Sequence, residues 1–249
     1  MKTWYFVAAL LLCTAACQKG KQTDPLPSVN KSEVKPRKDF AQAANPENPF
    51  DEVGKIHNLG LEALITYVET TRDTTRYGRS VFLAKFFKEH YNIHAKPEQS
   101  LKLEMAIKKD FKDVLFSQRI SNRSKEFLKE MSAILERIKT LEDYSPYKEA
   151  FVTLEKKIYL EKLPEKEKEI LLSTASIFRY SGLFWMEFYN NTPQAETWGL
   201  LRKLAGVIVG IAADATSFFY YAFVDSSYYE RLESTIDMSY VCGYGTGWY

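Results

Sequence analysis

The hydrophobic positions of this chain repeat at helical spacing. The clearest repeat lies in 121–142, where apolar residues recur at intervals of four and three: Phe127, Met131, Ile134, Ile138 and Leu141. No segment shows the strict apolar–polar alternation of a β-strand or the Asn-Gly turn of a hairpin. We therefore predict an all-α fold, a single-domain bundle of about six to eight helices.

The stretch 199–224 is predicted to be the buried central helix of that bundle. From Leu204 onward its only charged residue before Asp225 is Asp214. One side of this helix carries almost no side chain, because small residues recur there at helical spacing: Gly206, Gly210, Ala213 and Ser217. A second helix can approach such a surface closely.

Start signals place the other helices. Asn48, Pro49 and Asp51 form a cap, a first-turn proline and a dipole-complementing carboxylate, and cap-plus-proline pairs recur at Ser145-Pro146 and Thr192-Pro193. We expect helices at 50–71, 79–92, 121–142, around 147–158 and at 165–190. A helix carrying Leu103, Ile107, Phe111 and Val114 is expected to pair with 121–142 as an antiparallel hairpin.

The predicted inward faces follow from the spacing of the apolar residues. In 50–71 the shared face is Val53, His57, Gly60, Leu64, Tyr67 and Val68. In 79–92 it is Val81, Phe82, Lys85, Phe86 and Tyr91. His57 and Lys85 are thereby predicted to lie on buried faces.

The first residues read as an export signal. Lys2 precedes an apolar run at 4–12, too short to span a bilayer, and small residues lead to Cys17. Ala15-Ala16-Cys17 followed by polar residues resembles a bacterial lipoprotein signal, although Thr14 stands where leucine is commonest; a plain secretory signal is the alternative. We predict a signal peptide at 1–16, an acylated (palmitate-bearing) Cys17, an unfolded tether at 17–46, the bundle at 47–236 and a Gly/aromatic tail at 237–249.

These features set the expected location and exclude some partners. The chain has 249 residues and a net charge of +2, which gives no reason to expect nucleic acid. We expect a membrane-anchored protein of the cell envelope, at the outer membrane if the cell has two. Cleavage and acylation leave Cys242 as the free cysteine, so no internal disulfide is expected.

Candidate chemistry is sparse. His90 and His94 are four apart and His57 is a possible third metal ligand, but the order is not His-Glu-x-x-His and no Glu-x-x-His occurs. The chain also lacks Gly-x-Ser-x-Gly and a phosphate-binding loop. We therefore expect no metal, no cofactor and no catalytic residue.

Asp214 is the residue for which we expect a buried hydrogen-bond or ion-pair partner. An unpaired carboxylate inside a core helix is costly, so we expect a buried polar pair of His57 and Asp214, with Arg179 or a hydroxyl as alternative donors. Gly206-Val-Ile-Val-Gly210 also matches the small-xxx-small pattern of membrane helices, but a carboxylate at midspan costs about 2.5–3.5 kcal/mol. A core helix is the better interpretation.

Three segments together resemble a group of uncharacterised exported bacterial helical proteins: Asn48-Pro-Phe-Asp-x-x-Gly-x-x-His-Asn58, Ile177-Phe-Arg-Tyr-Ser181 and the Asp214 helix. The resemblance implies no activity. The expected function is binding or scaffolding by a lipid-anchored domain, with a partner protein not identified. The alternatives are a membrane-perturbing or immunity-type protein that inserts 199–224, and a histidine-dependent metal protein or hydrolase.

Overall fold

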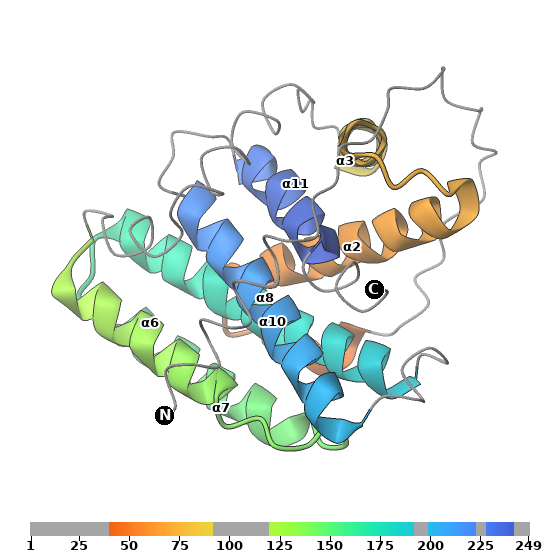
Figure 1. The fold of residues 1–249 in the computed structure, drawn as a ribbon. Helices are drawn as coiled ribbons and strands as arrows, with labels where there is room; N and C mark the ends of the chain where they lie inside the picture. Colours follow the sequence, from red (N-terminus) through yellow and green to blue (C-terminus); the bar gives the residue numbers. More distant parts are fainter. Residues whose placement is uncertain (1–39, 92–119, 192–198, 223–227, 242–249) are drawn as a thin grey trace.

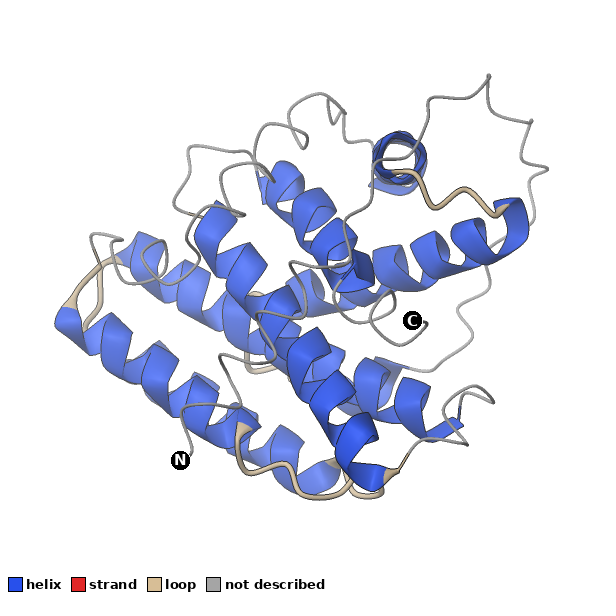
Figure 2. Ribbon diagram, viewed as in Figure 1, coloured by secondary structure: helices blue, strands red, loops and turns tan. Residues whose placement is uncertain are grey.

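The computed structural model describes residues 40–91, 120–191, 199–222 and 228–241, and every regular element in these ranges is a helix (Figure 2). The predicted all-α bundle is confirmed. The elements are η1 (Phe40–Ala43), α2 (Asp51–Thr71), α3 (Arg76–Tyr91), α6 (Asn122–Leu135), α7 (Ser145–Leu160), α8 (Glu165–Asn191), α10 (Leu200–Tyr221) and α11 (Tyr228–Ser239).

The centre of the bundle is α8 rather than α10. Figure 1 shows α6 and α7 on one flank of α8, α2, α3 and α11 on the other, and α10 lying across α8. Nearly every α8 side chain from Ile170 to Met186 is buried. In α10, by contrast, the first turn is exposed, with Leu201 84% accessible. The apolar composition of α10 thus reflects one face packed on α8 and α11 and a second face that is not fully covered.

The small residues of α10 do allow a close approach, as predicted, but they face aromatic rings rather than a bare backbone. A Cβ on Gly210 would lie 2.7 Å from the Trp185 indole, and a Cβ on Gly206 would overlap the Tyr189 ring. One glycine therefore faces one ring at each of two successive turns, and the two helices run antiparallel.

Several helix boundaries differ from the prediction, and α3 begins at Arg76 rather than at residue 79. α2 begins at Asp51 rather than at residue 50, and Asn48 does not cap it: the Asn48 side chain accepts a hydrogen bond from the Phe50 amide (2.9 Å) in a turn ahead of the helix. α6 ends at Leu135, yet Ile138 and Leu141 still pack against the core from the connection to α7. Their spacing correctly predicted that these two residues are buried, but it wrongly predicted that they belong to the helix.

The inward face predicted for α3 is wrong by a rotation about the helix axis. Leu83, Phe86 and Phe87 are buried, whereas the Lys85 side chain is 52% exposed and lies 3.9 Å from Glu89. Because α3 is aromatic on several sides, the choice of face depends on where α2 and α11 lie.

The folded part of the chain extends beyond the predicted domain limits. Phe40, Ala43 and Asn45 are buried ahead of residue 47, and α11 continues through Ser239, past residue 236. Residues 1–39, the helix expected around 103–114, Thr192-Pro193 and the tail from 242 lie outside the described residues. Within the described ranges, no helix has both the length and the hydropathy required to cross a bilayer.

Candidate functional site: two buried polar clusters

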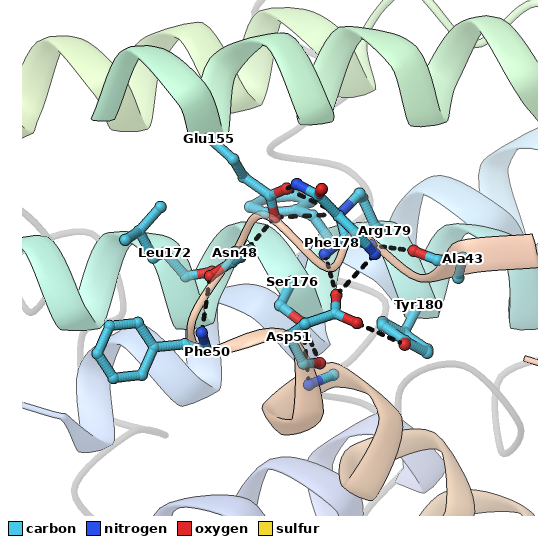
Figure 3. A network of polar contacts seen from close by, with 12 residues as sticks. Ala43, Asn48, Phe50, Asp51, Glu155, Leu172, Ser176, Phe178, Arg179 and Tyr180 are labelled. Atoms are coloured by element: carbon cyan, nitrogen blue, oxygen red, sulfur yellow. Dashed lines mark hydrogen bonds and ion pairs between the residues drawn. The ribbon is translucent and has the colours of Figure 1, made fainter. Parts of the chain in front are cut away.

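The first buried polar cluster is centred on Arg179, in the middle of α8 (Figure 3). Its side chain is fully buried, and Nε donates to both carboxylate oxygens of Glu155 on α7, at 3.0 and 3.1 Å. The two terminal nitrogens donate to the Asp51 carboxylate and to the Ala43 carbonyl oxygen. One guanidinium thus joins α8, α7, η1 and the start of α2.

Asparagine amides complete the contacts of Glu155. Asn45 Nδ2 donates to one of its oxygens at 2.6 Å, and Asn48 Nδ2 donates to the other at 2.9 Å and also lies 3.0 Å from the Leu172 carbonyl oxygen. Burial raises the pKa of Glu155, and Arg179 and the two amides oppose that shift only in part. Burial also disfavours the charge on Arg179, but Glu155 and Asp51 outweigh it and raise its pKa.

The same cluster fixes how α2 sits against α8. Tyr180 Oη donates to Asp51 Oδ2 at 3.0 Å, and Ser176 Oγ accepts from the Gly54 amide at 3.1 Å and donates to the Asp51 carbonyl oxygen at 2.8 Å. A Cβ on Gly54 would lie 2.6 Å from the Ser176 carbonyl oxygen, so this position admits glycine alone without a shift of backbone. These contacts hold the start of α2 against α8.

The second buried cluster contains the predicted pair, His57 on α2 and Asp214 on α10. Both side chains are fully buried, and each acts on the pKa of the other through its charge. The hydrogen bond to Asp214 comes from neither His57 nor Arg179: Trp185 Nε1 on α8 donates to Asp214 Oδ2 at 3.0 Å. Arg179, one of the two alternative donors, belongs to the first cluster.

The neighbouring amide determines the tautomer of His57. Asn58 Nδ2 donates to the Tyr180 carbonyl oxygen (2.6 Å), which leaves Asn58 Oδ1 as an acceptor 3.1 Å from His57 Nδ1. Nδ1 therefore carries the proton, and in the neutral ring Nε2 is an acceptor. Burial lowers the pKa of His57, and Asp214 opposes that shift in part.

Polar atoms without a hydrogen-bond partner gather around this pair. Within the described part of the chain they include His57 Nε2, Asp214 Oδ1 and the hydroxyls of Ser181, Ser217 and Ser239. Burial raises the pKa of Asp214, whereas His57 and the nearby Ser239 and Ser181 hydroxyls act in the opposite direction. Two acceptors, His57 Nε2 and Asp214 Oδ1, are thus buried without a donor, and three buried hydroxyls are also unpaired.

The second cluster has the residue types of a hydrolase but not the access. His57, Asp214 and Ser181 are all fully buried, so no substrate reaches them in this structure. The cluster brings polar side chains of α2, α8, α10 and α11 into the core, and several of their atoms lack a hydrogen-bond partner there.

The three histidines are separated as far as they are described. His57 is in the core, His90 is exposed on α3 with its ring 4.8 Å from the Phe86 ring, and His94 lies outside the described residues. Among the residues that the structure describes, no group of His, Cys, Asp and Glu has the arrangement of a metal site.

Sequence reasoning did not find the ion cluster around Arg179 or a third polar contact, in which Arg79 Nε donates to Asp237 (2.6 Å) and Ser80 to Glu233 (3.0 Å). The available signal was an arginine inside the otherwise uncharged run 170–186 of α8. No family model, curated protein or solved structure matches the chain, so the resemblance to exported helical proteins remains a prediction.

Proposed function

We propose that this protein is a lipid-anchored component of the cell envelope whose helical domain binds or scaffolds a partner and catalyses no reaction. The observation that carries the proposal is the N-terminal pattern, an apolar run and two alanines directly before Cys17, followed by polar residues. In a cell with two membranes, we place it at the outer membrane.

The attachment of the tether to the bundle supports this proposal. In the first segment that the structure describes, Ala43, Asn45 and Asp51 make hydrogen bonds with the buried Arg179 cluster. These hydrogen bonds connect the start of the described chain to α8, the most buried helix. Such a firm junction suits a domain that is displayed on a membrane.

A role in binding is supported by the distribution of polar groups. His57 and Asp214 of the second cluster are enclosed, whereas one surface recess borders the first cluster at Glu155. Another recess, of about 440 Å³, lies between α6 and α7 and carries both charge signs, with Glu130, Glu149, Arg137 and Lys157 in its lining. Mixed charge of this kind suits a protein surface better than a polyanion.

The membrane-inserting alternative receives less support. Insertion of α10 would separate Asp214 from the Trp185 indole and Gly210 from the ring that it accommodates. It would also carry a carboxylate into lipid.

Metabolic labelling with radioactive palmitate tests the anchor. We expect label in the wild-type protein and in Cys13→Ala, and none in Cys17→Ala, because acylation requires the Cys17 thiol. Cys13→Ala is the matched control, since it removes the other cysteine of the same segment. Label that persists in Cys17→Ala, or that never enters the wild type, would refute the anchor.

A further inference from the structure

The recess between α6 and α7 lies along an antiparallel helix pair. Figure 1 shows the two helices side by side on one flank of α8. Arg123 near the start of α6 contacts Glu161 after the end of α7 (2.8 Å), and Glu130 further along α6 contacts Lys157 (3.4 Å). The two chains therefore run in opposite directions. The buried and half-buried residues that line the recess are small or aliphatic: Ala133, Ile134, Ala150 and Leu154.

Four charged side chains line the same recess, and their signs alternate around it. Glu130 and Lys157 face each other at one end. Arg137 lies seven residues after Glu130, and Glu149 lies eight residues before Lys157, so two helical turns bring both to the other end. Each end thus has one carboxylate and one cation, and so does each side. We call Glu130, Arg137, Glu149 and Lys157 the recess charges.

We infer that the α6–α7 recess is the contact surface for a second copy of this chain, which meets it with its own α6–α7 pair around a two-fold axis. An axis along the recess places Glu130 over Lys157 of the second copy and Arg137 over Glu149 of the second copy. An axis across the recess places Glu130 over Arg137 of the second copy and Glu149 over Lys157 of the second copy. Because the signs alternate, opposite charges meet in both arrangements.

The recess charges favour a second copy over other occupants. A nucleic acid or an anionic lipid surface would meet two carboxylates as closely as two cations, and a cationic surface would do no better. A second copy carries the matching alternation by symmetry. Arg137 and Glu149 are exposed and form no ion pair within the described part of the chain, so both are available to it. Two antiparallel pairs that pack face to face make a four-helix bundle.

The size of this face indicates a weak dimer. α6 and α7 have 14 and 16 residues, so they are about 21 and 24 Å long and together about 20 Å wide. Such a face covers about 450 Å² per copy, or about 900 Å² per dimer, which is typical of transient interfaces. We expect a dissociation constant of about 10–100 µM in solution. The inference rests on the proposed binding role for the choice of this recess, and it names the partner.

Sedimentation equilibrium tests the inference with a chain that begins at Gln18, kept reduced so that Cys242 forms no disulfide. We expect a reversible monomer–dimer equilibrium between about 5 and 500 µM. Arg137→Glu places a carboxylate opposite a carboxylate twice in each dimer, so it should weaken dimerisation at least about tenfold. Lys88→Glu is the matched control, because Lys88 is an exposed cation on α3, and it should dimerise like the parent chain.

Reversal of all four recess charges gives a sharper test: Glu130→Lys, Arg137→Glu, Glu149→Lys and Lys157→Glu together. This variant keeps the net charge and an opposite-charge pair at each end, so it should fold and dimerise like the parent chain. It should not dimerise with the parent chain, because every contact between them joins like charges. Fluorescence-detected sedimentation of a labelled trace of one chain in an excess of the other measures this mixing.

Three results would overturn the inference: a parent chain that is monomeric at every concentration, a dimer that Arg137→Glu leaves unchanged, or free mixing of the parent chain with the reversed variant. Circular dichroism should show the same melting midpoint for the parent chain and the reversed variant, which separates loss of mixing from loss of folding. Since Cys17 is absent from this assay, its outcome is independent of the palmitate result that tests the proposed anchor.

Discussion

Replacing Arg179 with methionine tests whether the buried ion cluster holds the bundle together. Methionine keeps most of the side-chain volume but removes every donor. Glu155, which is 2% exposed, would keep only the two asparagine amides, and the Asp51 carboxylate and the Ala43 carbonyl oxygen would each lose a donor. Removing one partner of a buried ion pair costs about 3–5 kcal/mol. Domains are stable by only about 5–15 kcal/mol, so the loss should be large.

The loss should also depend on pH. Burial already raises the pKa of Glu155, and removing the opposing charge of Arg179 raises it further. A carboxyl group whose pKa is higher in the folded than in the unfolded chain binds more protons when folded, so stability falls as pH rises above the unfolded value of 4.5. The deficit of Arg179→Met relative to wild type should therefore be greater at pH 7 than at pH 5.

Urea unfolding followed by circular dichroism at both pH values measures this effect. Arg123→Met is the matched control, because Arg123 also contacts two carboxylates, Glu126 at 2.7 Å and Glu161 at 2.8 Å, but is exposed. It should change stability little. Adding Glu155→Gln to Arg179→Met should restore part of the loss, since no buried charge then lacks its partner. Equal effects of the two arginine variants, or a deficit that does not change with pH, would refute this account of the cluster.

Two further predictions concern the interior. Burial lowers the pKa of His57 below 6.5, so near that pH the unfolded chain binds a proton that the folded chain does not, and stability falls as the pH drops. His57→Gln should therefore flatten this fall in stability, measured by urea unfolding between pH 7.5 and 5.5. His90→Gln, which changes an exposed histidine, is the control and should leave the fall in place. Gly54→Ala should lower the free energy of unfolding by about 1–3 kcal/mol despite a helix-propensity gain of about 1 kcal/mol, because the new methyl meets the Ser176 carbonyl oxygen. Gly60→Ala meets only the end of the Ile236 side chain, which can rotate, and thermal melts should show a smaller loss; equal losses would contradict the contact argument.

The sequence allowed the helices to be predicted wherever the apolar stripe was one-sided. In α7 the predicted residues Tyr147, Phe151, Leu154 and Ile158 are buried, together with Glu155, which was not predicted. The prediction was wrong in α3, where aromatic residues on several sides leave the face to be chosen by the neighbouring helices. The spacing of apolar residues shows that a helix is partly buried. Which of its faces is buried depends on the helices that pack against it.

The polar contacts were predictable to a smaller extent. Asp214 was recognisable as a carboxylate that needs a donor, but its donor is an indole N–H, and nothing in local spacing selects Trp185. Arg179 draws its partners from Glu155, which is 24 residues away, and Asp51, which is 128 residues away. Such contacts depend on how three segments meet, which periodicity along one helix does not encode.

The register between α8 and α10 shows how these residues act together. Along α10, Gly206, Gly210 and Asp214 are spaced by four; on the antiparallel α8, Gly206 faces Tyr189, Gly210 faces Trp185, and Asp214 accepts the Trp185 N–H. A shift of α8 by one turn would move a ring off its glycine and take the indole N–H from the carboxylate. Each such shift of α8 along α10 would either make atoms overlap or leave the buried Asp214 carboxylate without its donor. The size of the glycines and the polarity of Asp214 therefore favour the same alignment of the two helices. The carboxylate that makes α10 a poor membrane span thus helps to align α10 on α8, together with the two glycines.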